Sequence, residues 1–84
     1  MSTNSRKVFD FLKANGVGVK FSVKDIQTAL DFDTHAKVIG SLRSFVKKGV
    51  VAKTTETRTV NGESKEVPVY WLTAQGATTN PDTL

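Results

Sequence analysis

Residues 33–51, DTHAKVIGSLRSFVKKGVV, decide the fold. Apolar side chains recur there every three or four positions, as on the buried stripe of an amphipathic helix: Val38, Leu42, Phe45 and Val46. Asp33 is a favourable N-cap, and the Lys47–Lys48 pair suits the negative end of the helix dipole. Gly49 lies where a left-handed C-cap ends a helix. The stretch therefore predicts a helix over 33–48 that leads into a strand.

The face of this helix opposite the apolar stripe is cationic. It carries basic side chains, small hydroxyls and a glycine, and no carboxylate: Lys37, Gly40, Arg43, Ser44 and Lys47, with Ser41 and Lys48 at its edge. A surface of one charge sign indicates a polyanionic partner. Gly40 costs about 1 kcal/mol relative to Ala inside a helix, and it would let the backbone approach a phosphate closely. The alternative is an ordinary solvated face with a lysine pair at the helix end.

Length and charge bound the protein class. Eighty-four residues make one domain with a small core and no large substrate cavity. The formal net charge is +4. Residues 1–49 hold nine Lys and Arg against four Asp, whereas residues 50–84 hold three against four acidic residues. The basic character therefore belongs to the helical half, which favours an anionic partner for that half.

Several function classes are excluded by residue types. The chain has no Cys and a single His, so we expect no disulfide, no metal site and no cofactor. No Ser/His/Asp motif or phosphate-cradling glycine loop is present, so we expect neither an enzyme nor a small-molecule substrate. No apolar run approaches the roughly 18 residues of a membrane span, and a cytoplasmic location is the default expectation.

Two shorter helices are predicted before the long one. The first covers about 5–15, capped by Asn4 or Ser5 and ended by Asn15–Gly16, with this buried stripe: Val8, Phe11 and Leu12, flanked by Phe9. Residues 16–21 then alternate as in a short strand. Ser22 and Asp25 form a capping-box pattern for a second helix over 23–30, with this apolar face: Val23, Ile26, Ala29 and Leu30. A turn at 31–33, with Phe32 between the helices, makes a helix-turn-helix candidate.

The second half has the period of a hairpin. Asn61–Gly62 is a strong two-residue turn signal between runs of Thr and Val. Pairing Val60 with Glu63 brings these residues opposite one another: Val51 with Leu72, Lys53 with Tyr70, and Arg58 with Lys65. Pro68 indicates that part of the second strand is an edge. The chain from Ala74 on has little apolar content, so we expect a domain over 5–76 and a flexible tail over 77–84.

The predicted order of elements and two local strings carry a family resemblance. SLRSFVKKGVV resembles the end of a winged-helix recognition helix, and YWLTAQG is similar to the last wing strand of many bacterial and phage regulators. Residues 5–76 therefore resemble the winged helix-turn-helix DNA-binding domain of small bacterial or phage transcriptional regulators. The fold class this implies is α+β, with three helices and a C-terminal β-hairpin wing.

The resemblance implies a double-stranded DNA-binding protein, associated with the nucleoid, that regulates transcription. Helix 33–48 would enter the major groove and hairpin 52–72 would act as the wing. The expected DNA-contacting residues lie on the cationic face, at its start and on the wing: Thr34, Lys37, Gly40, Ser41, Arg43, Ser44, Lys47, Lys48, Arg58 and Lys65. For Arg58 and Lys65 the alternative is a solvated charge cluster with three nearby glutamates: Glu56, Glu63 and Glu66.

A rival hypothesis is a winged helix that docks on a protein. If Tyr70 and Leu72 face the core, then Val69 and Trp71 point outward and would form a partner interface. The partner would be a second copy of the chain, a polymerase or another protein of the transcription machinery. The alternative for Trp71 is packing on the first helix or under the tail. RNA binding is a third possibility, because backbone-contacting cations serve both nucleic acids.

Overall fold

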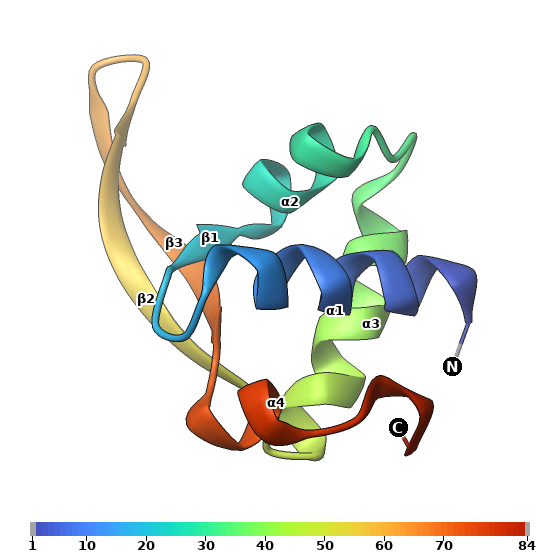
Figure 1. The fold of residues 1–84 in the computed structure, drawn as a ribbon. Helices are drawn as coiled ribbons and strands as arrows, with labels where there is room; N and C mark the ends of the chain where they lie inside the picture. Colours follow the sequence, from blue (N-terminus) through green and yellow to red (C-terminus); the bar gives the residue numbers. More distant parts are fainter. Residues whose placement is uncertain (1, 84) are drawn as a thin grey trace.

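Helices form the first half of the molecule and a hairpin the second, as the computed structural model of residues 2–83 shows (Figure 1). The helices of the first half are α1 (Thr3–Asn15), α2 (Val23–Leu30) and α3 (His35–Lys47), with the short strand β1 (Phe21–Ser22) before α2. They are followed by β2 (Val51–Val60), β3 (Glu63–Leu72), α4 (Ala74–Thr78) and the 3-10 turn η1 (Pro81–Thr83).

The core lies where α1 crosses α3 above the base of the sheet. Its buried side chains come from every layer: Val8, Phe9, Leu12, Ile26, Val38, Leu42, Phe45, Val50, Val51, Tyr70 and Leu72. The α1 stripe is shifted from the prediction: Phe9, expected to flank it, is wholly buried, and Phe11, expected within it, is only half-buried. The reason is that α1 has two neighbours. Phe9 packs on Phe45 of α3, whereas Phe11 packs on Phe21 of β1, with ring centroids 5.5 and 4.9 Å apart.

Two other predicted core positions are wrong. Ala29 is exposed, because α2 buries Ile26 fully and covers the rest of its apolar face only in part. Val46 is 36% exposed. It lies beside the stripe of α3, outside the surface that α1 and α2 cover.

The starts of α1 and α3 differ from the prediction. The N-cap of α1 is Ser2, whose Oγ accepts the Ser5 amide at 3.2 Å, so the helix begins before the predicted cap positions. The N-cap of α3 is Thr34, without a side-chain capping bond. Asp33 instead accepts a hydrogen bond from the Lys37 ammonium at 2.7 Å, so its carboxylate supports the first turn as an i,i+4 ion pair.

Other predicted termini are confirmed. Ser22 and Asp25 form the complete capping box of α2. At the end of α3, Gly49 has a φ of 80° and its amide bonds the carbonyl of Val46. The Val50 amide reaches back to the carbonyl of Phe45 at 3.1 Å, which completes a Schellman motif. The recognition-helix candidate therefore ends sharply, and β2 leaves in a defined direction.

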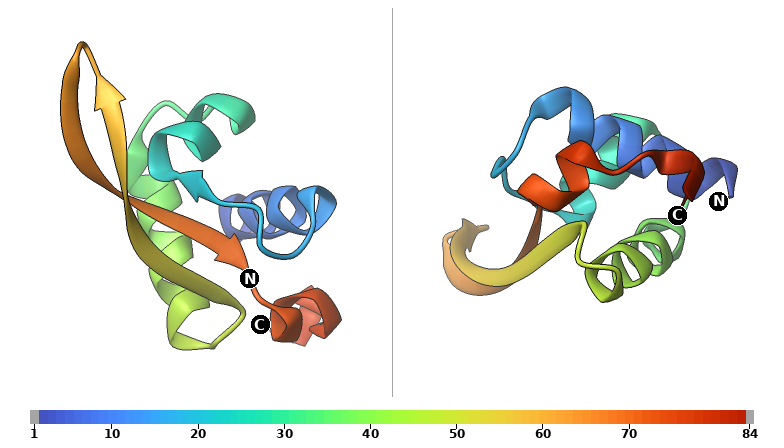
Figure 2. Two further views of the ribbon diagram at one scale, coloured as in Figure 1. Left: turned by 90° about the vertical axis from the view of Figure 1, so that its left-hand side faces the viewer. Right: turned by 60° about the horizontal axis from the view of Figure 1, so that its bottom comes forward.

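The sheet has the strand order β1-β3-β2 and is antiparallel. The predicted register is confirmed at each pair named: Val51 with Leu72, Lys53 with Tyr70, Arg58 with Lys65, and Val60 with Glu63. Asn61 and Gly62 both have positive φ, 53° and 80°, as a type I′ turn requires. Because β1 pairs only with residues 69–70, the rest of the hairpin is a two-stranded ribbon that rises away from the helices (Figures 1 and 2). Pro68 stands where that outer edge of β3 becomes free.

The chain from Ala74 on forms the regular elements α4 and η1, which the low apolar content of this stretch did not predict, and the flexibility expected of 77–84 stays a prediction. Thr73 caps α4 and its hydroxyl donates to the carbonyl of Gly49, while Gln75 donates to the carbonyl of Lys48. Gly76 is buried against Val50. Hydrophobic periodicity did not predict α4, because this helix packs through a glycine against the backbone of Val50 and through hydrogen bonds to backbone carbonyls. The boundary at residue 76 stays a prediction.

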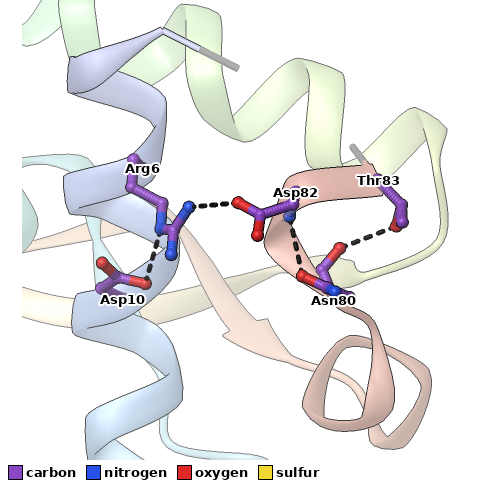
Figure 3. Close-up of polar contacts among 5 residues, drawn as sticks. All are labelled: Arg6, Asp10, Asn80, Asp82 and Thr83. Atoms are coloured by element: carbon purple, nitrogen blue, oxygen red, sulfur yellow. Dashed lines mark hydrogen bonds and ion pairs between the residues drawn. The ribbon is translucent and has the colours of Figure 1, made fainter.

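Beyond α4, an ion-pair cluster attaches η1 to the start of α1 (Figure 3). The Arg6 guanidinium lies 2.8 Å from a carboxylate oxygen of Asp82 and 3.4 Å from one of Asp10. Asn80 accepts the Asp82 amide at 2.9 Å and shapes the turn. All three charged groups are solvent-exposed, so this cluster adds little stability and mainly positions the C-terminal turn.

A Gly76→Ala substitution should destabilise the fold by about 1–3 kcal/mol. The added Cβ would overlap the carbonyl oxygen of Val50 and approach Leu72 Cδ1 to 2.7 Å. Urea denaturation measures the loss. The matched control is Gly40→Ala, where the added Cβ meets nothing within 4 Å and the helix should gain up to about 1 kcal/mol. Equal stability of the two variants would show that α4 is not packed on Val50.

Candidate nucleic-acid interface

One face of α3 is left uncovered by the rest of the molecule. Val38, Ser41, Leu42 and Phe45 are buried on the side that meets α1 and α2. The opposite face is exposed along its whole length: Ala36, Lys37, Gly40, Arg43, Ser44 and Lys47. A Cβ added at Gly40, in the middle of this face, meets nothing within 4 Å. The helix backbone is therefore open to a close approach at that point.

Positive charge concentrates in the C-terminal half of this face. Lys37 is paired with Asp33, whose pKa its ammonium holds below the ordinary value, first by the hydrogen bond and then by charge. Within residues 2–83, the three cations further along the helix take part in none of the ion pairs: Arg43, Lys47 and Lys48. All three are exposed. The structure thus leaves their charge available to an external anion.

Ser41 belongs to the helix interface and not to the exposed face. It is only 5% exposed, and its Oγ lies 2.9 Å from the Oγ of Ser5 on α1. The same hydroxyl donates to the carbonyl of Lys37. Ser41 sits beside the apolar stripe, on the side that α1 covers, so its prediction as a DNA contact is wrong. Thr34, in contrast, is an exposed N-cap whose hydroxyl makes no capping bond.

The two basic residues predicted on the wing have different surroundings. Lys65 is exposed near the tip. Arg58, directly opposite it in the ladder, is half-buried and lies 2.9 Å from Oδ2 of Asp25 on α2. Burial would raise the pKa of Asp25, but the Ser22 amide and the Arg58 guanidinium lower it more, and the net shift is downward. The partner of Arg58 is thus a residue of α2, and not one of the hairpin glutamates considered from sequence.

The predicted outward face of β3 is partly wrong. Val69 is wholly buried, and it lies on β3 at the level where Ser22 of β1 and Thr54 of β2 pair with it. Its side chain is therefore closed to a partner. Trp71 is half-buried, and the Lys20 ammonium lies 5.6 Å from its ring centroid, within cation–π range.

Other kinds of site find little support in the described part of the chain. Residues 2–83 contain no group of three or more His, Cys, Asp or Glu placed to hold a metal ion. None of their helices is long and apolar enough to cross a membrane. An open hollow of about 330 Å³ lies where the start of α1 meets η1, and residues of α3 do not line it.

Comparison with known proteins adds one structural likeness. No protein-family model and no curated protein matches the chain. Among solved structures, the fold is similar to that of Bacillus subtilis PadR in complex with operator DNA, with a TM-score of 0.63 and 20% sequence identity. The fold is a winged helix-turn-helix. The likeness covers 89% of this chain and 42% of the PadR chain, so this chain spans about two fifths of the length of that protein.

Alanine substitutions of the two serines of α3 should differ in their effect on stability, because Ser41 lies on the covered side of the helix and Ser44 on the free side. Ser41→Ala should cost about 1 kcal/mol of unfolding free energy, because it removes the part-buried hydroxyl bond that joins α3 to Ser5 of α1. Ser44→Ala, on the exposed face of the same helix, should stay within about 0.5 kcal/mol of the unaltered protein. Urea denaturation followed by circular dichroism measures both. A Ser44 variant that loses as much as the Ser41 variant would contradict this division of the helix.

Proposed function

We propose that this winged-helix domain binds double-stranded DNA through the free face of α3 and regulates transcription. The observation that carries the proposal is the exposed cationic face itself. It has an open backbone at Gly40 and three cations without an internal ion pair: Arg43, Lys47 and Lys48. The likeness to PadR, whose structure contains operator DNA, supports the same function by analogy of fold.

The geometry suits the major groove of B-form DNA. That groove is about 12 Å wide and admits a helix, whereas the major groove of A-form RNA is too narrow and deep to be read this way. Arg43 and Lys47 lie on the face that would enter the groove, where they can reach phosphates or guanine edges. Thr34 at the helix start and Lys48 at its end are placed to contact the flanking strands. Lys65 would reach the backbone from the wing.

The rival hypothesis of a protein-docking module loses one of its two residues. It combined Val69 and Trp71 as an outward apolar pair, and Val69 is wholly buried. Trp71 alone presents part of its ring, with a lysine over it. A homodimer, or a contact with the transcription machinery, stays a prediction. A chromosomal DNA partner would place the protein in the cytoplasm with the nucleoid.

The test is a fluorescence-anisotropy titration of labelled duplex at several salt concentrations with Arg43→Ala, Lys47→Ala and Lys48→Ala. A phosphate contact releases counterions, so each such variant should lower the salt slope by about one and weaken all sequences alike. A cation that reads guanine should instead cost about 1–3 kcal/mol and relax one base position. Ser44→Glu should also weaken binding, because its carboxylate would face phosphate.

The matched control is Lys13→Ala, which removes an exposed cation from α1 without touching α3. It should keep both the affinity and the salt slope. Urea denaturation verifies that every variant folds. If the three α3 variants are folded and bind duplex with unchanged affinity and slope, then this face is not the interface and the proposal is wrong.

A further inference from the structure

The outer part of the hairpin has almost no packing support. Of residues 53–66, all are exposed except Arg58, which is half-buried. Strand β1 stops at the level of Val69, which pairs with Thr54, so the ribbon continues for about six residues beyond its last inter-strand support. At about 3.3 Å per residue this makes a lever of roughly 20 Å. A two-stranded ribbon without a packed face is marginally stable and free to swing.

Arg58 attaches this lever to the helical half near its free end. Within residues 2–83, its 2.9 Å contact with Asp25 is the only side-chain hydrogen bond or ion pair that joins residues 53–67 to another element. The anchor itself is rigid. The same Oδ2 of Asp25 accepts the Ser22 amide at 3.0 Å in the capping box of α2. The guanidinium is therefore bound to the backbone of the helix-turn-helix through a single carboxylate.

The charges on the wing agree with this role. Arg58 and Lys65 lie directly opposite in the ladder, an arrangement in which two like charges repel. Asp25 on α2 offsets the Arg58 charge, and Glu56 on the same strand also favours its charged form. Lys65 forms no ion pair within residues 2–83. One of the two cations is thus used internally, and the other remains available.

We propose that Arg58 is a positioning residue. Its ion pair with Asp25 sets the angle between the wing and α2, and it thereby holds Lys65 where the wing meets the same duplex as α3. This last step rests on the proposed function of α3. An exposed ion pair adds little to global stability. At the end of a lever, however, even a weak contact narrows the range of wing positions.

Whether Asp25→Asn raises or lowers the affinity for DNA distinguishes a positioning role of Arg58 from a direct contact with phosphate. If Arg58 contacted phosphate, Asp25 would compete for it, and Asp25→Asn would release the guanidinium and raise DNA affinity. Removing a carboxylate also favours a polyanion by charge alone. If Arg58 positions the wing, Asp25→Asn should lower the affinity instead. A decrease cannot come from long-range electrostatics. Because Asp25 also belongs to the capping box of α2, the decrease reports the lost position of the wing only where urea denaturation shows an unchanged stability and Arg58→Gln, which leaves the capping box intact, gives the same loss.

The first experiment measures the wing without DNA. Because the chain has no Cys, cysteines placed at exposed Ser64 on the wing and Thr28 on α2 take spin labels at two defined sites. Pulsed electron spin resonance should give one narrow distance distribution in the otherwise unaltered chain. Asp25→Asn and Arg58→Gln should each broaden it. Lys65→Gln, which removes the same charge across the ladder, is the matched control and should leave it narrow. An unchanged distribution in the first two variants overturns the proposal.

The second experiment repeats the anisotropy titration with the same variants made in the chain without added cysteines or spin labels. Asp25→Asn and Arg58→Gln should each weaken duplex binding by about two- to fivefold, the range of one exposed ion pair, with an unchanged salt slope. The double variant should lose no more than either alone, because both remove one interaction. Lys65→Gln should lower the slope by about one.

A higher affinity for Asp25→Asn, or a lower slope for Arg58→Gln, would make Arg58 a phosphate contact and overturn the positioning role. If the unaltered chain binds no duplex while the distance distributions broaden as expected, then the wing attachment holds. In that case the proposed function of α3 fails on its own.

Discussion

The backbone of Val50 joins the two halves of this molecule, and the rest of the architecture depends on that junction. Its amide closes the Schellman motif of α3 on the carbonyl of Phe45, and its carbonyl accepts the amide of Thr73 after β3. Its side chain is buried in the core, and Gly76 of α4 packs against its backbone carbonyl group. One residue therefore fixes the end of α3, the start of β2 and the return of the chain. A shift there would move the wing relative to the helix.

Because the junction at Val50 is fixed, α3 cannot rotate about its axis. The same side of the helix therefore always faces α1 and α2, and the other side always faces solvent. Ser41 and Ser44 illustrate the division. They are three positions apart on one helix, yet one is bonded to α1 and the other is open to solvent. The wing is fixed in the same way at its base, where β1 and β3 pair, and only its outer part depends on Asp25. The fold supplies the position of the helix, and a single ion pair supplies that of the wing tip.

The sequence predicted what short-range physical chemistry controls. The turn at Asn61–Gly62 and the hairpin register follow from positive φ and the strand period, and the C-cap at Gly49 follows from the same glycine preference. It failed where a residue's neighbour comes from far along the chain. Ser41 is buried because of Ser5, which is 36 positions away, and Arg58 is paired with Asp25, which is 33 positions away. The α4 segment was missed because a buried glycine leaves no hydrophobic signal.

The acidic residues decide which cations can serve an external anion. Asp33 and Asp25 pair with Lys37 and Arg58, two of the predicted DNA contacts. A phosphate that recruits either cation must displace a carboxylate, and the freed carboxylate then lies near the DNA and repels it. Asp33 also lies just before α3, where the helix dipole stabilises a negative charge. Its carboxylate therefore stays ionised and in place even when Lys37 turns to a phosphate. The cations in the C-terminal half of α3, and Lys65 on the wing, have no carboxylate that a phosphate would have to displace. The attraction of a DNA backbone to the protein should therefore be strongest at those two places. A duplex held at those two places would be contacted by the end of the helix and by the wing, with the open backbone at Gly40 between the helix ends.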